Sequence, residues 1–230
     1  MSEAATPKHI GFILDGNRRW AQENGLPKLV GHKKGYDNLK TIAEACFEKG
    51  IEVVSAFIFS TENWSREKDE VDYLMDLALK LFKRDLKELM EKNFKLVVSG
   101  SREKLSPKLV EAIEDAQRKT SGNSGGTINI CFNYGGQTEI SDAFKKLLES
   151  GVNSNSVAPE MIRATLYPPE LPPVDYIVRT SGEKRISNFL LWDAAYAELE
   201  FVEVHWPAFS EKDLQKVLAE YSARTRRFGQ

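Results

Sequence analysis

The feature that most constrains the fold is a repeated alternation of short apolar runs with longer amphipathic segments. The apolar runs are rich in Ile, Val and Phe, and nearly continuous in apolar character, as strands buried on both faces of a parallel sheet are. Strands alternating with helices predict an α/β protein whose mainly parallel, six-stranded sheet is flanked by helices. The runs that we expect to form its strands are His9–Leu14, Ile51–Phe59, Phe94–Ser99, Thr127–Phe132, Val174–Arg179 and Glu200–His205.

The segments between these runs carry the spacing of helices. Tyr36, Leu39 and Ala43 fall on one face of a helix that Gly50 is expected to end. A longer apolar stripe, 71–89, predicts a single long helix. Neither the helices nor the strands show an internal repeat.

The length of 230 residues suits one sizeable domain. No loop-forming stretch is long enough to serve as a domain linker. We therefore expect one domain over 1–230, with a disordered N-terminus at 1–8 and a C-terminal tail at 224–230.

Charge, cysteines and hydropathy exclude several classes of protein. A net charge of −2 argues against a dedicated nucleic-acid binder. Cys46 lies in a helical pattern and Cys131 in a strand pattern, which favours buried thiols in a reducing compartment over a disulfide. The apolar runs fall short of the ~20 residues that cross a bilayer, and the N-terminal segment lacks a signal-peptide core. These features predict a cytoplasmic protein.

Polar clusters follow four of the predicted strands, where each strand ends. In open parallel sheets, ligands bind beyond the carboxyl ends of the strands. Four such clusters at one edge therefore predict a site there. They are Asp15–Trp20, Ser60–Trp64, Asn133–Gly136 and Arg179–Arg185.

The cluster after the first strand has the chemistry of an anion and metal site. The Asp15 carboxylate can ligate a hard cation such as Mg²⁺. Gly16 and Asn17 can turn successive N–H groups toward a phosphate. Arg18 and Arg19 add charge-assisted donors in fork geometry. Because a tryptophan follows, the segment predicts a substrate with a diphosphate head and an apolar body.

Each cluster also has a plainer interpretation. An Asp-Gly-Asn sequence is usually only a turn, surface arginines are usually solvated, and Trp64 and Trp192 suit a core. Walker A and G-x-G-x-x-G phosphate signatures are absent. The histidines are scattered without zinc spacing, and no G-x-S-x-G elbow supports a serine hydrolase. The convergence of the clusters favours an anion site, while a flavodoxin-like binding or signalling module stays open.

Taken together, the motifs resemble those of the cis-prenyltransferases of the undecaprenyl diphosphate synthase family. The similarity extends over nearly the whole chain, and several of its motifs are long and in the right order. They are His9–Ala21, Gly31-His32, Phe59–Trp64 with Arg66, Asn133–Gly136, Arg179–Glu183, Arg185–Trp192, Ala195–Leu199 and Arg226–Gly229.

The resemblance implies repeated condensation of isopentenyl diphosphate with an allylic diphosphate, farnesyl or geranyl, each new double bond being cis. The product implied most directly is undecaprenyl diphosphate, a cell-wall lipid carrier. The resemblance also implies a hydrophobic tunnel between the sheet and two helices, Mg²⁺ as the cofactor, and a homodimer. It implies no nucleic-acid partner and at most peripheral contact with the inner face of the membrane.

Residue roles are carried over from the same resemblance. Asp15 and Asn63 take the catalytic positions, Asp15 by holding Mg²⁺ and Asn63 where the family's proton acceptor is assigned. A neutral amide is a poor base, so Asn63 more plausibly orients a diphosphate oxygen that takes the proton. Glu198 matches the second metal ligand. The residues implied to bind substrate are Gly16, Asn17, Arg18, Arg19, Trp20, Lys28, His32, Ser60, Thr61, Glu62, Trp64, Arg66, Arg179, Arg185, Ile186 and Ser187.

The tunnel leaves the product length open. Ile58, Leu74, Ala78 and Ile128 match tunnel positions. Long-chain bacterial members often carry a small residue where this chain has Ile58, so a short- or medium-chain product is an alternative.

The C-terminal tail and the catalytic groups indicate how the chain would act in an assembly, as an active member of a dimer or as a non-catalytic subunit. Arg227 and Gly229 match an Arg-x-Gly tail that reaches the partner's diphosphate in related dimers. A non-catalytic prenyltransferase subunit is the remaining alternative. Such subunits typically lose the metal carboxylate and the catalytic loop, whereas this chain keeps Asp15 and Asn63.

Overall fold

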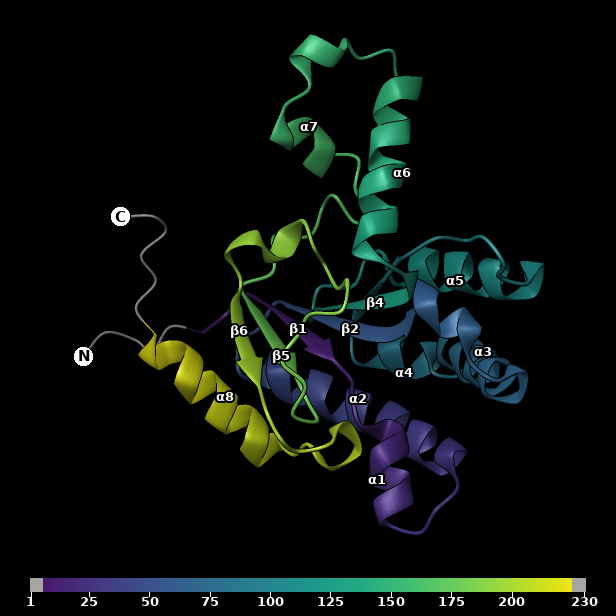
Figure 1. Ribbon diagram of the computed structural model, residues 1–230, viewed down its shortest axis with the longest axis vertical. Coiled ribbons are helices and arrows are strands. Elements are labelled where there is room, and N and C mark those ends of the chain that lie inside the picture. The colour runs from purple at the N-terminus through teal and green to yellow at the C-terminus, as the bar shows by residue number, and fades with distance from the viewer. Residues whose placement is uncertain (1–5, 225–230) are drawn as a thin grey trace.

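A six-stranded sheet forms the centre of the molecule, and every pair of neighbouring strands in it is parallel (Figure 1). The computed structural model describes residues 6–224. The order β3-β4-β2-β1-β5-β6 places β1 near the middle, and the predicted α/β class with six strands is confirmed. The strands are β1 (His9–Ile13), β2 (Val53–Ser60), β3 (Lys95–Ser99), β4 (Thr127–Tyr134), β5 (Tyr176–Arg179) and β6 (Glu198–Phe201).

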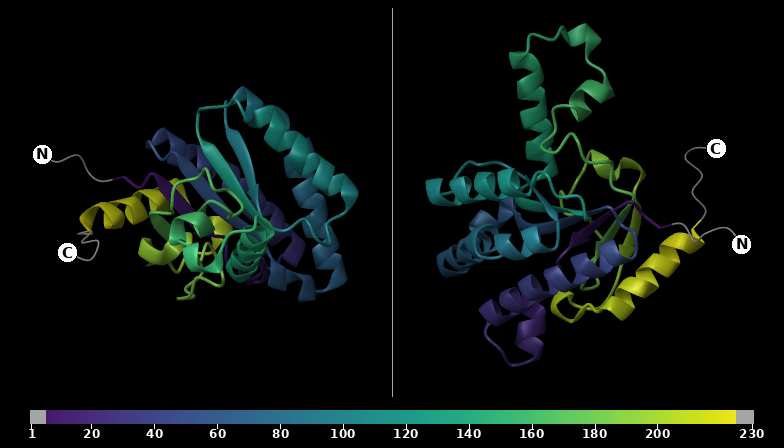
Figure 2. Two further views of the ribbon diagram at one scale, coloured as in Figure 1. Left: turned by 90° about the horizontal axis from the view of Figure 1, so that it is seen from above. Right: turned by 180° about the vertical axis from the view of Figure 1, so that it is seen from behind.

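Eight α-helices and four short 3₁₀ helices connect the strands of this part of the chain. The pair α6 and α7 projects from one end of the sheet in two opposite views (Figures 1 and 2). Within residues 6–224, no helix combines the length and apolar character that a membrane span requires. The helices are α1 (Asn17–Glu23), α2 (Lys28–Glu48), η1 (Thr61–Ser65), α3 (Lys68–Lys83), α4 (Leu86–Glu91), α5 (Pro107–Thr120), α6 (Gly136–Glu149), η2 (Ser154–Ser156), α7 (Pro159–Arg163), η3 (Asp193–Tyr196), η4 (Trp206–Ala208) and α8 (Glu211–Ala223).

Two hydrophobic cores cover the two faces of the sheet. The larger one joins α2, α3, α5 and α8 to strand residues such as Phe12, and the smaller one joins Ile13 to Phe189 and Leu190 of the loop after β5. Successive strand residues face opposite sides, so both faces of β1 are buried. This burial explains the continuous apolar character of the runs in the sequence. The two cysteines are free and buried, as predicted.

A row of buried polar side chains crosses four strands of the sheet. His9 Nδ1 donates to the carbonyl of Pro172 (2.8 Å), and His9 Nε2 accepts from the Ser55 hydroxyl (2.7 Å). Asn129 donates to Ser55 (2.9 Å) and accepts from Ser99 (2.7 Å). Burial lowers the pKa of His9 to about 4, so its ring is neutral. Four neighbouring strands, β1, β2, β4 and β3, thus each contribute one polar side chain to this row. The buried polar groups satisfy one another's hydrogen bonds.

The long helix predicted over 71–89 is interrupted, and this prediction was wrong in its extent. α3 ends at Lys83 and α4 begins at Leu86, with Arg84 and Asp85 between them. The Asp85 carboxylate accepts hydrogen bonds from the Tyr36 hydroxyl on α2 and pairs with Lys40. Aspartate favours helix ends over helix interiors, because its short side chain competes with the helical backbone.

The last strand lies earlier in the chain than the predicted run 200–205. β6 spans Glu198–Phe201, and the chain then leaves the sheet. The N–H of Trp206 donates to the carbonyl of Asp15 (3.0 Å), so the following segment packs against the end of β1 instead of extending β6. At the N-terminus, the segment predicted as disordered, 1–8, is described from residue 6. There the N–H of Lys8 donates to Asp175 (2.8 Å).

Candidate active site

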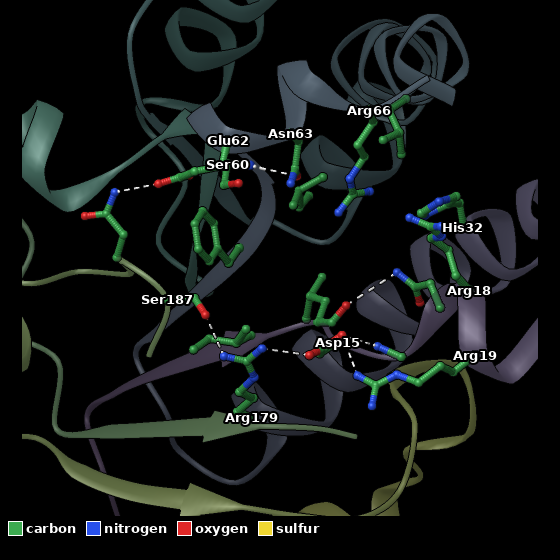
Figure 3. A pocket seen from close by; sticks show the side chains of 18 of the residues that line it. Asp15, Arg18, Arg19, His32, Ser60, Glu62, Asn63, Arg66, Arg179 and Ser187 are labelled. Atoms are coloured by element: carbon green, nitrogen blue, oxygen red, sulfur yellow. Dashed lines mark hydrogen bonds and ion pairs between the residues drawn. The ribbon is translucent and has the colours of Figure 1, made fainter. Parts of the chain in front are cut away.

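A large cavity lies at the carboxyl ends of β1, β2 and β5 (Figure 3). Its volume is about 770 Å³. The loops after these three strands supply most of its polar wall, as the sheet topology requires. It is lined by Ile13, Leu14, Asp15, Gly16, Asn17, Arg18, Arg19, Gln22, His32, Phe57, Ile58, Ser60, Glu62, Asn63, Arg66, Leu74, Arg179, Arg185, Ser187 and Asn188.

Asp15 lies between two arginines at one side of this cavity. Its Oδ2 accepts from Arg179 Nη2 (2.7 Å), and its Oδ1 lies 3.0 Å from Arg19 Nη2. Burial alone would raise the pKa of Asp15, but the hydrogen bonds and charges of Arg179 and Arg19 outweigh it and lower that pKa. The carboxylate is therefore ionised and fixed where β1 ends.

Gly16 permits the turn that orients Asp15. Its φ of 99° lies in the left-handed region, and its N–H donates to Asp15 Oδ1 (2.7 Å). A Cβ at this position would meet His205 Nδ1 at 2.6 Å and Ser181 Oγ at 2.7 Å. Glycine is therefore required both by the backbone conformation and by the contacts with the segments after β5 and β6.

Arg179, from a buried position at the end of β5, joins Asp15 to the loop after β5 on the same side of the cavity. Its Nη1 donates to the carbonyl of Arg185 (2.5 Å) and to the hydroxyl of Ser187 (2.7 Å), and its Nη2 binds Asp15. Its Nε is buried without a hydrogen-bond partner among residues 6–224. The guanidinium thus joins the first strand to the loop after the fifth.

A buried glutamate that the sequence analysis missed holds the cations on the third side. Glu70, in the first turn of α3, is 1% exposed. It accepts from Arg66 (3.0 Å) and His32 (3.1 Å), and Lys28 lies at 3.6 Å. Burial alone would raise the pKa of Glu70, but the charges of Arg66, His32 and Arg18 lower it. The i,i+4 spacing of Arg66 and Glu70 was the signal for this contact.

Asn63 is held by the 3₁₀ turn that follows β2. Its Oδ1 accepts from the N–H of Ser60 (3.1 Å), one half of a capping box in which Ser60 also accepts from the backbone of Asn63. With the oxygen engaged, the amide offers its NH₂ donors to the cavity. Next to it, Glu62 accepts from Asn188 (3.0 Å) and so joins this turn to the loop after β5.

An apolar channel continues inward from the cavity. A second cavity of about 60 Å³ is lined by Leu14, Ile58 and Leu74, which also line the first, and by Ala78. A third cavity of about 40 Å³ includes Ile128 in its wall. The four residues predicted for the tunnel therefore lie along one route between the sheet and the helices α2 and α3.

Several residues predicted to bind substrate do not line the main cavity. The Trp64 ring instead donates to Asn133 (2.8 Å) and packs against Phe59 at the core. Lys28 pairs with Glu67. Trp20, Thr61 and Ile186 also lie outside the lining, whereas the sequence analysis had missed Gln22, Phe57 and Asn188, which belong to it.

Glu198 lies far from Asp15 within one chain. It begins β6 in register with Tyr176, which is in register with Ile10 near the start of β1. Five residues separate Ile10 from Asp15, roughly 16 Å along a strand. Glu198 instead pairs with Arg224 (3.1 Å).

The tail positions Arg227 and Gly229 lie outside the described residues.

The charges of the cavity wall define what it can bind. Arginines predominate over carboxylates on it, and Arg18 forms no ion pair with any other described residue. The channel behind them is apolar. An α/β fold that joins these two regions has the chemistry to hold an amphiphile with a polyanionic head.

Comparison with known proteins identifies the family. Residues 13–229 match the family model described as putative undecaprenyl diphosphate synthase. The chain belongs to this family and is a transferase of prenyl groups. It is 41% identical over 229 residues to an isoprenyl transferase of Neisseria meningitidis serogroup B, covering 100% of this chain and 92% of the relative.

Further relatives agree in sequence and in structure. A ditrans,polycis-undecaprenyl-diphosphate synthase ((2E,6E)-farnesyl-diphosphate specific) of Legionella pneumophila is 42% identical, with 97% of this chain and 96% of the relative covered. The lavandulyl diphosphate synthase of Lavandula x intermedia, in complex with dimethylallyl diphosphate, superimposes with a TM-score of 0.93 at 31% identity, covering 98% and 99%. A probable undecaprenyl diphosphate synthase of Campylobacter jejuni gives 0.84 at 30%, covering 98% and 100%.

Replacing the buried carboxylate of Glu70 is expected to destabilise the protein in a pH-dependent way. The Glu70→Gln variant should lose about 2–3 kcal/mol at pH 7, the range for hydrogen bonds to charged groups. Because the folded pKa of Glu70 is lowered, this contribution is present above the unfolded value of about 4.3 and is lost as the pH falls through the folded pKa. Urea unfolding at several pH values measures it.

Glu67→Gln provides the matched control for this prediction. Glu67 also pairs with Lys28, but its side chain is 77% exposed. Its replacement should cost much less at every pH. Equal losses for the two variants would show that Glu70 acts only as a surface charge.

Proposed function

We propose that this prenyltransferase condenses isopentenyl diphosphate with an allylic diphosphate, repeatedly and with cis geometry, to give a polyprenyl diphosphate. The observation that carries the proposal is the meeting of two arginine-bearing segments, Gly16–Arg19 and Arg179–Arg185, at Asp15 on the cavity wall, at the mouth of the apolar channel. Two diphosphate heads need two such sets of cations, and one growing chain needs one channel. The names of the relatives, which include farnesyl-diphosphate-specific synthases, support the same substrate class.

The two heads are assigned by the position of the channel. We place the allylic diphosphate against Gly16–Arg19, because Leu14 and Asn17 also line the entrance to the channel. Isopentenyl diphosphate then lies against Arg179, Arg185 and Ser187. In that arrangement, Arg18 and Arg19 neutralise charge that develops on the departing allylic diphosphate.

The donor set fits Mg²⁺ bound together with substrate. Within residues 6–224, no group of three or more His, Cys, Asp or Glu side chains is placed to hold a metal. Mg²⁺ is commonly held by one or two carboxylates plus substrate phosphates, and Asp15 supplies one hard oxygen ligand on the cavity wall. When bound, the ion would add positive charge at the allylic diphosphate.

Asn63 has a positioning role in this proposal. Its amide oxygen is engaged with Ser60, so the side chain presents donors and has no free basic atom toward the cavity. We assign it to orienting a diphosphate oxygen, which then takes the proton that leaves isopentenyl diphosphate after the new bond forms.

A homodimer completes the proposal. Phe144 and Leu148 lie one turn apart on the projecting helix α6 and are 52% and 58% exposed. Apolar pairs this exposed favour coverage by another protein surface. Glu198 and Asp15 lie too far apart within one chain to bind the same metal ion. A Glu198 that shares an ion with Asp15 would therefore come from a second copy of the chain. The enzyme would be cytoplasmic, with only peripheral membrane contact to pass on its lipid product.

The alternative of a short- or medium-chain product has support from the channel. Its inner cavities, of about 60 and 40 Å³, are small beside the 770 Å³ of the mouth. Ile58 lies where the mouth narrows into the channel.

Activity tests the proposal directly. Purified protein with labelled isopentenyl diphosphate and geranyl or farnesyl diphosphate should form polyprenyl products and release diphosphate, and EDTA should abolish both. Asp15→Asn should reduce turnover by at least ~100-fold, the scale for removing one electrostatic stabiliser. The absence of chain formation by the wild type, with Mg²⁺ present, would instead identify a non-catalytic subunit.

The assignment of Asn63 predicts the behaviour of a variant. Asn63→Asp replaces the NH₂ donor by a charge that repels diphosphate, so turnover should fall by roughly 10- to 100-fold. Asn63→Gln, which keeps the amide but displaces it, serves as the control and should also be impaired. A marked gain in kcat for Asn63→Asp would refute the positioning role and favour a base at this position.

Light scattering tests the dimer. The wild type should have about twice the mass of the 26.0 kDa chain. Introducing Glu at both Phe144 and Leu148 should give a monomer, because two charges would then be buried without partners. Met90→Glu changes another exposed apolar residue, which lies on α4 and is 43% exposed, and this variant should remain dimeric. A monomeric wild type would refute this part of the proposal.

A further inference from the structure

Asn188, in the loop after β5, joins three segments of the chain at the wall of the main cavity. Its Nδ2 donates to Glu62 Oε1 on η1 (3.0 Å), and its Oδ1 accepts from the backbone N–H of Gln137 (2.8 Å). Its carbonyl accepts from the N–H of Gly136 (2.7 Å). Gly136 and Gln137 begin α6. Through one residue, the loop after β5 is therefore tied both to η1 and to the first turn of α6.

The backbone around Asn188 has an uncommon conformation. Asn188 has a φ of 65°, and the residue before it, Ser187, has a φ of 48°. The left-handed region is costly for residues other than glycine, although asparagine adopts it more readily than most. Such a conformation persists where surrounding contacts fix it, and it is found often at functional sites. The hydrogen bonds of Asn188 to η1 and α6 supply such contacts here.

The three segments approach each other closely at this point. A Cβ on Gly135, the residue before α6, would meet Thr61 Oγ1 on η1 at 2.7 Å and Asn188 Nδ2 at 2.8 Å. Both distances are shorter than a side chain tolerates. Glycine at this position therefore allows the loop after β5 to contact η1 directly.

The bond to Glu62 completes a path between two parts of the candidate site. Arg179 Nη1 donates to Ser187 Oγ (2.7 Å), and Figure 3 shows these two side chains together, apart from Glu62. Asn188 follows Ser187 in the chain and binds Glu62. Asn63 follows Glu62 on η1. Hydrogen bonds and two peptide links thus connect Arg179 to the turn that holds Asn63.

The two ends of this path have to be placed relative to each other for the proposed reaction. Arg179 and Ser187 are assigned to isopentenyl diphosphate, and Asn63 is assigned to the diphosphate oxygen that takes its proton. A displacement of about 1 Å near reacting groups can reduce a rate by about 100-fold. The loop after β5 and η1 leave strands that are separated by β1. A direct bond between them therefore limits how far their separation can vary.

We propose that Asn188 is a positioning residue, which holds the loop after β5 against η1 so that Asn63 meets the diphosphate oxygen. The inference rests on the proposed prenyl transfer and adds to it a residue that acts through Ser187 and Asn63. Among residues 6–224, the hydrogen bonds of Asn188 go to η1 and α6 and not to Gly16–Arg19. Binding of the allylic diphosphate, which is placed at Gly16–Arg19, should therefore depend little on Asn188.

Asn188→Asp tests the inference with almost no change in shape. The new carboxylate still accepts from the N–H of Gln137, but it has no donor for Glu62 and repels that carboxylate. Initial rates of diphosphate release should show kcat lowered by about 10- to 100-fold and KM for isopentenyl diphosphate raised at least ~5-fold. KM for the allylic diphosphate should stay within about twofold of the wild-type value. A loss of stability alone would reduce the amount of active enzyme and leave both KM values unchanged.

Exchanging the two groups gives the most specific test. Glu62→Gln combined with Asn188→Asp places the amide on η1 and the carboxylate on the loop, with the total charge of the wild type. The amide can then donate in the opposite direction, so kcat should be at least ~10-fold higher than in Asn188→Asp alone. Glu62→Gln alone replaces a charged acceptor by a weaker neutral one and should lower kcat. The same substitution should thus be harmful in the wild type and beneficial beside Asn188→Asp.

Gln137→Glu is the matched control for the added charge. Gln137 is exposed and lies outside the lining of the three cavities described above. This variant places a carboxylate next to Asn188 in space and keeps the backbone N–H that Asn188 binds. Its kcat and both KM values should stay within about twofold of the wild type. A loss equal to that of Asn188→Asp would show that added charge is responsible and would overturn the inference.

Asn188→Gly keeps the inference testable where Asn188→Asp does not fold. Glycine adopts positive φ readily but lacks both side-chain hydrogen bonds, so the loop keeps its conformation and loses its connection to η1. Its kcat should still fall by about 10-fold or more. Wild-type kcat in Asn188→Gly, or a double variant no more active than Asn188→Asp, would overturn the inference and leave the proposed function standing. The absence of chain formation by the wild type would overturn both.

Discussion

The site depends on one buried cation. The guanidinium of Arg179 is almost completely buried at the end of β5, where an unpaired charge would be very costly. Asp15, the carbonyl of Arg185 and the hydroxyl of Ser187 together satisfy most of its donors. Because these partners come from β1 and from the loop after β5, the charge fixes both relative to each other. The segments that carry Arg19 and Arg179 are therefore positioned by electrostatics as much as by the sheet.

The ion pairs around the cavity hold its arginines ready to bind the phosphate oxygens of a substrate. Arg19 and Arg179 hold Asp15, while Arg66 and His32 hold Glu70. Carboxylates of the protein at or beside the cavity thus keep Arg19, Arg179 and Arg66 in place, whereas burial lowers the pKa of His32 and favours its neutral ring. A substrate that brings several phosphate oxygens can share these cations without first ordering flexible side chains. Such preorganisation reduces the cost of binding and places charge where the reaction develops it.

The sequence predicted the sheet and the position of the site because both follow from local patterns. Continuous apolar runs marked the first five strands and overlapped only the end of the sixth, and the polar residues after them marked the carboxyl edge. The break at Asp85 was not predictable, since it depends on Tyr36 and Lys40, residues more than 40 positions away. Glu70 was missed for a similar reason: one i,i+4 arginine is a common surface pattern, and only the packing of α2 against α3 buries the carboxylate. Trp64 was assigned to the substrate, but its ring is directed to Asn133 by tertiary contacts.

The buried row from His9 to Ser99 has a consequence for assembly of the sheet. The four strands that it crosses are neighbours in space but not in chain order, because β4 and β2 lie between β3 and β1. A shift of any one strand by a single residue would turn its polar member to the other face and leave hydrogen-bonding groups unsatisfied in apolar surroundings. The row therefore favours the native register of the strands. Because the loops that build the candidate site leave the ends of these strands, the geometry of the site depends on side chains that lie outside the cavity.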